Sequence, residues 1–125
     1  MSISRLFLLL VALGGFFSVA LGAFAAHGLK AILSPGLLQT FQTGVDYQAL
    51  HSLALLAVGL LLREEGASAL RLAGWSFASG ILVFSGSLYL LALTDARWLG
   101  AVTPFGGVAF LLGWAALAWA VVRRR

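Results

Sequence analysis

The 125-residue sequence contains no cysteine, and only 10% of its residues carry a charge. Without cysteine the chain cannot form a disulfide framework, a Cys-ligated metal site or an iron–sulfur cluster. A soluble domain usually carries about 25% charged residues, and so short a chain cannot bury the apolar surface of a 62% hydrophobic composition. These shortages exclude an ordinary soluble enzyme, a disordered chain and a nucleic-acid-binding module. They predict a small polytopic membrane protein.

Four long apolar runs follow one another with almost no charge, at about residues 6–26, 45–62, 72–94 and 98–122. About 20 apolar residues cross a hydrocarbon core of ~30 Å as a helix, and helices satisfy their own backbone polar groups, as lipid requires. The runs lack the alternation of β-barrel strands. The sequence therefore predicts an all-α, integral membrane four-helix bundle, a single transmembrane domain of residues 1–125 whose main partner is the lipid bilayer.

Two segments in the first half of the chain allow alternative interpretations. The triplet at residues 23–25 resembles a signal-peptide cleavage site, but the apolar run before it is longer than a typical signal-peptide core. In the first loop, Ser34 and Pro35 form a helix-start signal. We expect residues 35–43 to form a short interfacial helix that bends at Gly44 into the second span. The alternative is one continuous helix from residue 35 to 62.

The net charge of +4 is distributed between the apolar runs, which favours a role in topology over nucleic-acid binding. Arg5, Arg63, Arg71 and the three arginines at 123–125 fall on one side of the four-span topology, whereas Lys30 and Arg97 fall on the other. This excess predicts that both termini and the second loop lie in the cytoplasm. In a mitochondrial membrane the same rule would place that side in the matrix.

Small residues recur along the runs at spacings that let helices approach closely, where dispersion contacts and weak Cα–H···O bonds accumulate. The predicted packing positions are Gly14, Ser18, Gly22 and Ala26 in the first run, Ser76, Gly80 and Gly86 in the third, and Gly106, Gly107 and Gly113 in the fourth. Their partner helix could belong to the same chain or to another one. A homo-oligomer or a larger membrane complex is therefore an open expectation.

Polar side chains collect near one end of the predicted bundle, on the non-cytoplasmic side. This candidate polar cluster consists of His27, Lys30, Asp46, Tyr47, Gln48, His51, Tyr89, Asp95 and Arg97. Ionisable groups at membrane depth are costly and face the protein interior or a water cavity. The favoured interpretation is a structural network whose formal charges cancel. The alternatives are a proton or ligand site, and haem or metal binding through His27 and His51.

Four ordered motifs resemble a known family. They are residues 22–30 (GAFAAHGLK), 47–56 (YQALHSLALL), 84–89 (FSGSLY) and 98–107 (WLGAVTPFGG). They resemble the small inner-membrane proteins of domain of unknown function 423, which are similar to eukaryotic transmembrane protein 256. Ala25 and Val102 stand where the family commonly has glycine and isoleucine. The resemblance implies a four-span bundle in a bacterial inner membrane or a mitochondrial membrane, and it implies no established biochemical activity.

No nucleophile–base set, phosphate-binding loop or paired intramembrane carboxylate is recognisable, so the sequence predicts no enzyme, no metal and no cofactor. The favoured function is a structural, accessory or membrane-stabilising component. A small oligomeric transporter or channel is the alternative, with Asp46 or His51 as the coupling group. Haem or metal binding through the two histidines is a second alternative.

Overall fold

A computed structural model describes residues 1–124, and it is helical along most of its length. The elements are α1 (Ile3–His27), the short 3-10 helix η1 (Leu29–Ala31), α2 (Pro35–Glu64), α3 (Ser68–Gly80), the π-helical segment η2 (Ile81–Ser85), α4 (Gly86–Thr94), the 3-10 helix η3 (Arg97–Ala101) and α5 (Thr103–Arg123). Within residues 1–124, four helical segments are long and apolar enough to cross a membrane. The predicted all-α, four-span architecture is confirmed.

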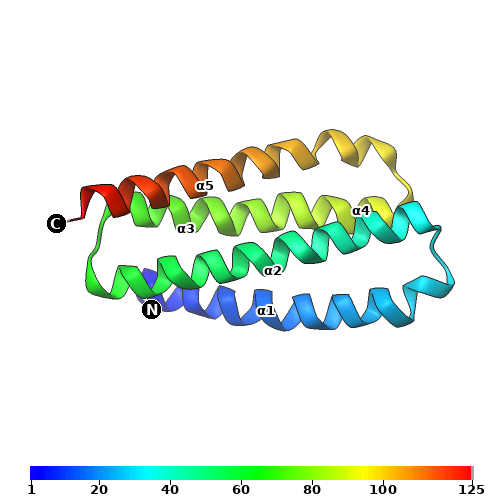
Figure 1. Cartoon of the computed structure of the whole chain (residues 1–125), viewed down its shortest axis with the longest axis horizontal. Helices are drawn as coiled ribbons and strands as arrows, with labels where there is room; N and C mark the ends of the chain where they lie inside the picture. Colours follow the sequence, from blue (N-terminus) through cyan, green and yellow to red (C-terminus); the bar gives the residue numbers. More distant parts are fainter. Residues whose placement is uncertain (125) are drawn as a thin grey trace.

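The rods run antiparallel, and α1 and α5 lie on the outer sides of the assembly (Figure 1). α1 packs along α2, α5 packs along α3 and η2, and α2 also packs against the whole rod formed by α3, η2 and α4. The central α2 is therefore the most enclosed helix. Of its most apolar window 44% is buried, against 11% for the window in α1. Both described ends of the chain lie at the same end of the bundle (Figure 1).

The first loop ends where the sequence predicts, but the helix after it differs from the expectation. Ser34 caps α2 by accepting a hydrogen bond from the Leu37 amide (3.3 Å), and Pro35 occupies the first turn. α2 then continues without a break to Glu64. The separate interfacial helix is therefore not observed, and the continuous alternative is. Gly44 lies within this continuous helix and is a contact point, where an added Cβ would lie 2.7 Å from the Tyr89 ring.

The third span is one helical rod formed by α3, η2 and α4, and its backbone hydrogen bonds change from the α-helical to the π-helical pattern at η2. A π-helical turn accommodates an extra residue and bulges outward. Here the bulge lies between two neighbours. The Ser85 hydroxyl donates to the Gly44 carbonyl of α2 (2.7 Å), and the Phe84 backbone approaches Gly106 of α5. Glycine at residue 106 is what allows that backbone approach.

Two apolar clusters lie toward opposite ends of the bundle. The larger one centres on Phe7, Phe77 and Phe110, and the smaller one contains Leu29 and Phe41. Phenylalanine rings fill the space that glycines of the facing helix leave free. An added Cβ at Gly113, for example, would lie 2.6 Å from the Phe77 ring. The helix interfaces therefore depend on large residues facing small ones.

The small residues singled out in the sequence have unequal surroundings. Five of the glycines face a side chain of a neighbouring helix: Gly14 faces Ser52, Gly22 faces Val45, Gly80 faces Phe110, Gly106 faces Phe84 and Gly113 faces Phe77. Ser76 is buried, and the Ser18 hydroxyl donates a hydrogen bond to the Gly14 carbonyl. Gly86 has no such neighbour within 4 Å, Gly107 has only a distant ring edge, and Ala26 is exposed. Three close approaches between helices come from glycines outside that set, at Gly44, Gly59 and Gly74. Sequence spacing identifies a small residue but not the side chain that faces it.

Candidate functional site

The depth of the polar side chains follows from the register of α1 against α2. Gly14 faces Ser52, and Gly22 faces Val45. The apolar run 6–26 of α1 has its midpoint at residue 16, which this register places level with about residue 51 of α2. At 1.5 Å per residue, His51 then lies about 15 Å from either edge of the apolar zone. His51 is therefore near the middle of the apolar zone, the level called the midplane below.

His51 is 2% exposed, and both of its ring nitrogens have partners. Nδ1 lies 2.8 Å from the Tyr47 carbonyl, and Nε2 lies 3.0 Å from the indole nitrogen of Trp114. A carbonyl only accepts and an indole N–H only donates, so the proton is on Nδ1 and Nε2 accepts. The ring also stacks on Phe110 at 3.5 Å between centroids. His51 is thus a neutral imidazole with no lone pair available to a metal.

Gln48 joins three helices one turn away from His51. Its amide nitrogen donates to the Gly14 carbonyl of α1 (2.9 Å), and its amide oxygen accepts from the Tyr89 hydroxyl of α4 (2.6 Å). The Gly14 carbonyl also accepts from Ser18 (2.7 Å). Because every polar atom of this group is matched with a partner of the opposite kind, burial in lipid leaves little unsatisfied.

Buried hydroxyls extend this pattern along the bundle. Ser87 and Thr103 are hydrogen-bonded to each other between α4 and α5 (2.6 Å), and Ser4 donates to the Gly59 carbonyl (2.8 Å). Among residues 1–124, Ser52 Oγ is the buried side-chain polar atom without a hydrogen bond. It lies against Gly14. Among the buried serines, Ser4, Ser85 and Ser87 therefore tie helices together.

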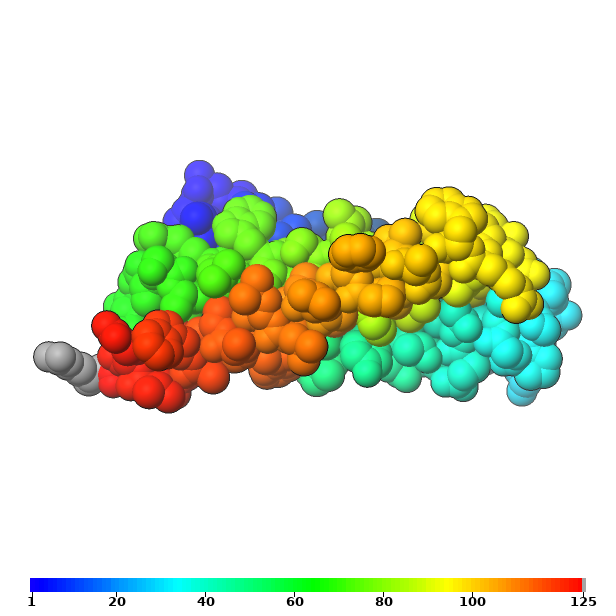
Figure 2. Space-filling view, turned by 90° about the horizontal axis from the view of Figure 1, so that it is seen from above, coloured from blue at the N-terminus to red at the C-terminus, as the bar shows by residue number. Residues whose placement is uncertain are grey.

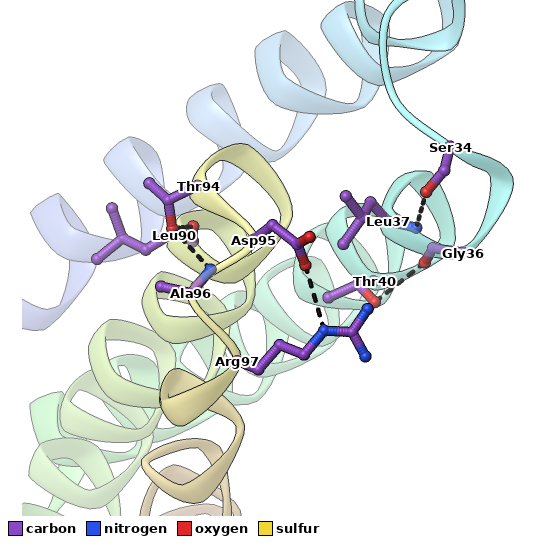
Figure 3. A network of polar contacts seen from close by, with 9 residues as sticks. All are labelled: Ser34, Gly36, Leu37, Thr40, Leu90, Thr94, Asp95, Ala96 and Arg97. Carbon is purple, nitrogen blue, oxygen red and sulfur yellow. Dashed lines mark hydrogen bonds and ion pairs between the residues drawn. The ribbon is translucent and has the colours of Figure 1, made fainter.

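The remaining residues of the candidate polar cluster lie nearer the end of the bundle that carries the first and third loops, called the loop end below. Asp46 accepts from its neighbour Gln42 (2.9 Å), and Asp95 pairs with Arg97 across one turn (3.6 Å). Figure 3 shows the Asp95–Arg97 pair in the third loop, beside the start of α2. His27 is exposed at the end of α1. In the part of the chain that the structure describes, no hydrogen bond or ion pair connects His27, Lys30, Asp46 and His51 with one another.

The candidate polar cluster thus separates into a midplane group and a loop-end group, instead of forming one charge-balanced network. Helix geometry explains the separation. At about 100° per residue, Asp46 points about 160° away from Gln48 and about 140° away from His51. Asp46 is accordingly exposed while the other two are buried. Sequence position alone placed these residues together because it ignores their direction around the helix.

The two histidines do not approach each other. His27 is level with about residue 40 of α2 in the α1–α2 register, so it lies about 17 Å from His51 along the helix axis. No group of three His, Asp or Glu residues within 1–124 could hold a metal ion. A single haem iron or metal ion cannot be reached from both histidines in this arrangement, and the donor set does not fit such a group.

A cleft of about 490 Å³ opens between α2 and α5 beside His51. Its lining is mostly apolar and aromatic, and includes Tyr47, Phe84, Phe110 and Trp114. The nitrogens of His51 are already engaged there. Between His51 and the end of the bundle that carries the termini, the larger apolar cluster fills the interior. The cleft therefore offers lipid an apolar and aromatic surface and does not continue as a polar path.

Comparison with known proteins agrees with the topology. The family model described as "Protein of unknown function (DUF423)" matches residues 21–107. The chain is 50% identical to a UPF0382 membrane protein of Haemophilus influenzae over 90% of both chains. It is 42% identical to the UPF0382 membrane protein YwdK of Bacillus subtilis (95% of this chain, 98% of that one). It is 41% identical to the UPF0382 inner membrane protein YgdD of Escherichia coli (96% and 92%). No solved structure matches.

The family match covers the motifs around His27, His51, Tyr89 and Thr103, and the relatives carry membrane or inner-membrane names without an enzymatic activity. The predicted family is thereby confirmed. The chain belongs to the DUF423 family of small bacterial membrane proteins, whose biochemical function is not established.

Proposed function

We propose that this protein is a non-enzymatic, structural component of the bacterial inner membrane that acts by helix packing, as an accessory subunit or as a membrane-stabilising element. The observation that carries the proposal is the closed bonding of His51, between the Tyr47 carbonyl and the Trp114 indole at the midplane. A proton carrier or a ligand site needs a polar group with a hydrogen-bond donor or acceptor that is not already occupied. The polar side-chain atoms of Gln48 and the Nε2 atom of His51 are already hydrogen-bonded to groups of neighbouring helices.

The outer face of α1 supports an accessory role. Only 11% of its apolar window is buried within the chain, and large side chains such as Phe16 and Val19 are exposed along it. This face contacts lipid in a monomer, and in an assembly it would contact a second copy or another membrane protein. Native purification in a mild detergent tests this part. Recovery of the lone polypeptide without self-association would count against the accessory role.

The structural role of His51 is tested by two variants that break the same bond from opposite sides, His51→Phe and Trp114→Phe. A structural role predicts that both lower the midpoint of unfolding, and that wild-type proteoliposomes carry no proton flux measurable with an internal pH dye. Tyr47→Phe serves as the control, because His51 bonds the Tyr47 carbonyl and not its hydroxyl. Proton flux through the wild type that His51→Phe abolishes would refute the proposal and favour transport.

We also propose that both termini and the loop between α2 and α3 face the cytoplasm, on the strength of the arginine excess at that end. The absence of cysteine makes the test simple. A membrane-impermeant maleimide applied to intact spheroplasts should label an Ala96→Cys variant and leave a Ser68→Cys variant unlabelled. Both should react after permeabilisation. The reverse labelling pattern would overturn the orientation.

A further inference from the structure

A hollow of about 550 Å³ lies where α1 begins and α2 ends. Its lining residues are Ser2, Ser4, Arg5, Leu8, Leu62 and Arg63. Two arginines from different helices therefore line one hollow, together with two serines and two leucines. It belongs to the end of the bundle that carries both the start of α1 and the end of α5, which lie on opposite sides of the molecule there (Figure 2).

The two helices that carry these arginines are fixed to each other at this level. The buried Ser4 hydroxyl donates to the Gly59 carbonyl (2.8 Å). Leu8 packs so closely that a Cβ added at Gly59 would lie 2.9 Å from its side chain. Arg5 and Arg63 lie one and four residues from these contacts, so the backbones that carry both cations are held in place.

The neighbouring carboxylates are engaged elsewhere. Arg124 is hydrogen-bonded to Glu64 and lies 3.5 Å from Glu65. The hydrogen bond to Glu64 and the charge of Glu65 raise the pKa of Arg124 above its ordinary value. Within residues 1–124 neither Arg5 nor Arg63 has an ion-pair partner. At the opposite end of the bundle, by contrast, the hollow beside Arg97 also contains Asp95.

We infer that the hollow at Arg5 and Arg63 binds the phosphate of an anionic phospholipid. Guanidinium groups match phosphate oxygens in geometry and charge, and basic pockets between membrane helices bind anionic headgroups. The apolar run of α1 begins directly after Arg5, so the arginines lie at headgroup level and Leu8 and Leu62 contact the first acyl methylenes. The inference holds for either orientation of the chain and for a monomer or an oligomer, and can therefore fail independently of the proposed function.

Native mass spectrometry of the full chain in detergent tests this inference, with dioleoyl phosphatidylglycerol and dioleoyl phosphatidylcholine as matched probes. The wild type should bind phosphatidylglycerol in preference to phosphatidylcholine. Each basic residue at an anionic surface contributes about a factor of five in affinity, so the double variant Arg5→Gln/Arg63→Gln should bind phosphatidylglycerol about 25-fold more weakly. Arg63→Gln alone should show about a fivefold loss and serves if the double variant loses its helical circular dichroism.

The matched control is Lys30→Gln/Arg97→Gln, which removes the same charge at the opposite end and should leave the affinity unchanged. Equal binding of the two lipids by the wild type would overturn the inference. So would an equal loss in the control variant, which would indicate attraction to net charge and no defined site. Stabilisation by millimolar inorganic phosphate as large as that by phosphatidylglycerol would assign the hollow to a soluble anion and also overturn the lipid site.

Discussion

Gly106 and Gly107 are adjacent in α5 but have opposite surroundings, which gives a sharp test of the packing. A Cβ added at Gly106 would overlap the Phe84 backbone, with the Phe84 Cα at 2.7 Å. A Cβ added at Gly107 would meet only the edge of the Phe84 ring, at 3.9 Å. We therefore expect Gly106→Ala to destabilise the bundle and Gly107→Ala to leave it as stable or more so.

The expected change in the free energy of unfolding is the sum of two opposing contributions. Alanine is about 1 kcal/mol better than glycine inside a helix, and this term favours both variants. Overpacking costs about 1–3 kcal/mol, and at Gly106 the upper end applies, because the atoms in the way are backbone atoms that cannot rotate aside. The net expectation is a loss of about 2 kcal/mol for Gly106→Ala and a gain of up to about 1 kcal/mol for Gly107→Ala.

Equilibrium unfolding in mixed micelles, followed by circular dichroism as the SDS fraction rises, measures both variants. A difference of about 3 kcal/mol between them corresponds to more than a hundredfold change in the ratio of folded to unfolded protein. Gly15→Ala is a further control, since nothing lies within 4 Å of that site. Equal effects at residues 106 and 107 would refute the packing of Phe84 on α5.

Three further predictions use the same unfolding assay. Gln48→Leu and Tyr89→Phe should each destabilise by about 1 kcal/mol, and their double-mutant cycle should show a coupling of similar size; additive effects would contradict the hydrogen bond between them. Asp95 has a positive φ of 53°, so Asp95→Gly should be neutral or stabilising and Asp95→Val should cost about 1–2 kcal/mol; equal stability of the two variants would contradict the left-handed turn. Arg124→Gln should leave the unfolding midpoint unchanged because its ion pairs with Glu64 and Glu65 are largely exposed to solvent, and a clear shift would show that these ion pairs stabilise the fold.

Much of the fold could be predicted because lipid imposes a simple constraint. Uninterrupted apolar runs must be helices, and Ser34–Pro35 is a local start signal whose hydrogen bond forms within four residues. The end of that helix was harder to predict. Gly44 suggests a bend in sequence, but α2 continues through it, and the glycine instead leaves room for the Tyr89 ring. A contact between residues 45 apart cannot be read from a local pattern.

The candidate site shows the same division. Sequence reasoning identified Gln48, His51 and Tyr89 as unusual polar residues at membrane depth, but grouped them with Asp46, which faces the other way around α2. The indole partner of His51 was also missed, because Trp114 lies 63 residues away. The family motifs included Ser85, whose bond to the Gly44 carbonyl became visible only in the structure.

The scarcity of charge and the four long apolar runs by themselves determined that this chain is a membrane protein, that it forms four helices and where the loops fall. These features depend on the transfer of apolar residues from water and on bonds within each helix, and both are local. The tertiary structure decided which polar group meets which. It placed His51 between a carbonyl and an indole, joined Gln48 to two helices and brought Arg5 beside Arg63. The reason is physical, since the direction of a side chain around its helix has no meaning until the neighbouring helices are in place.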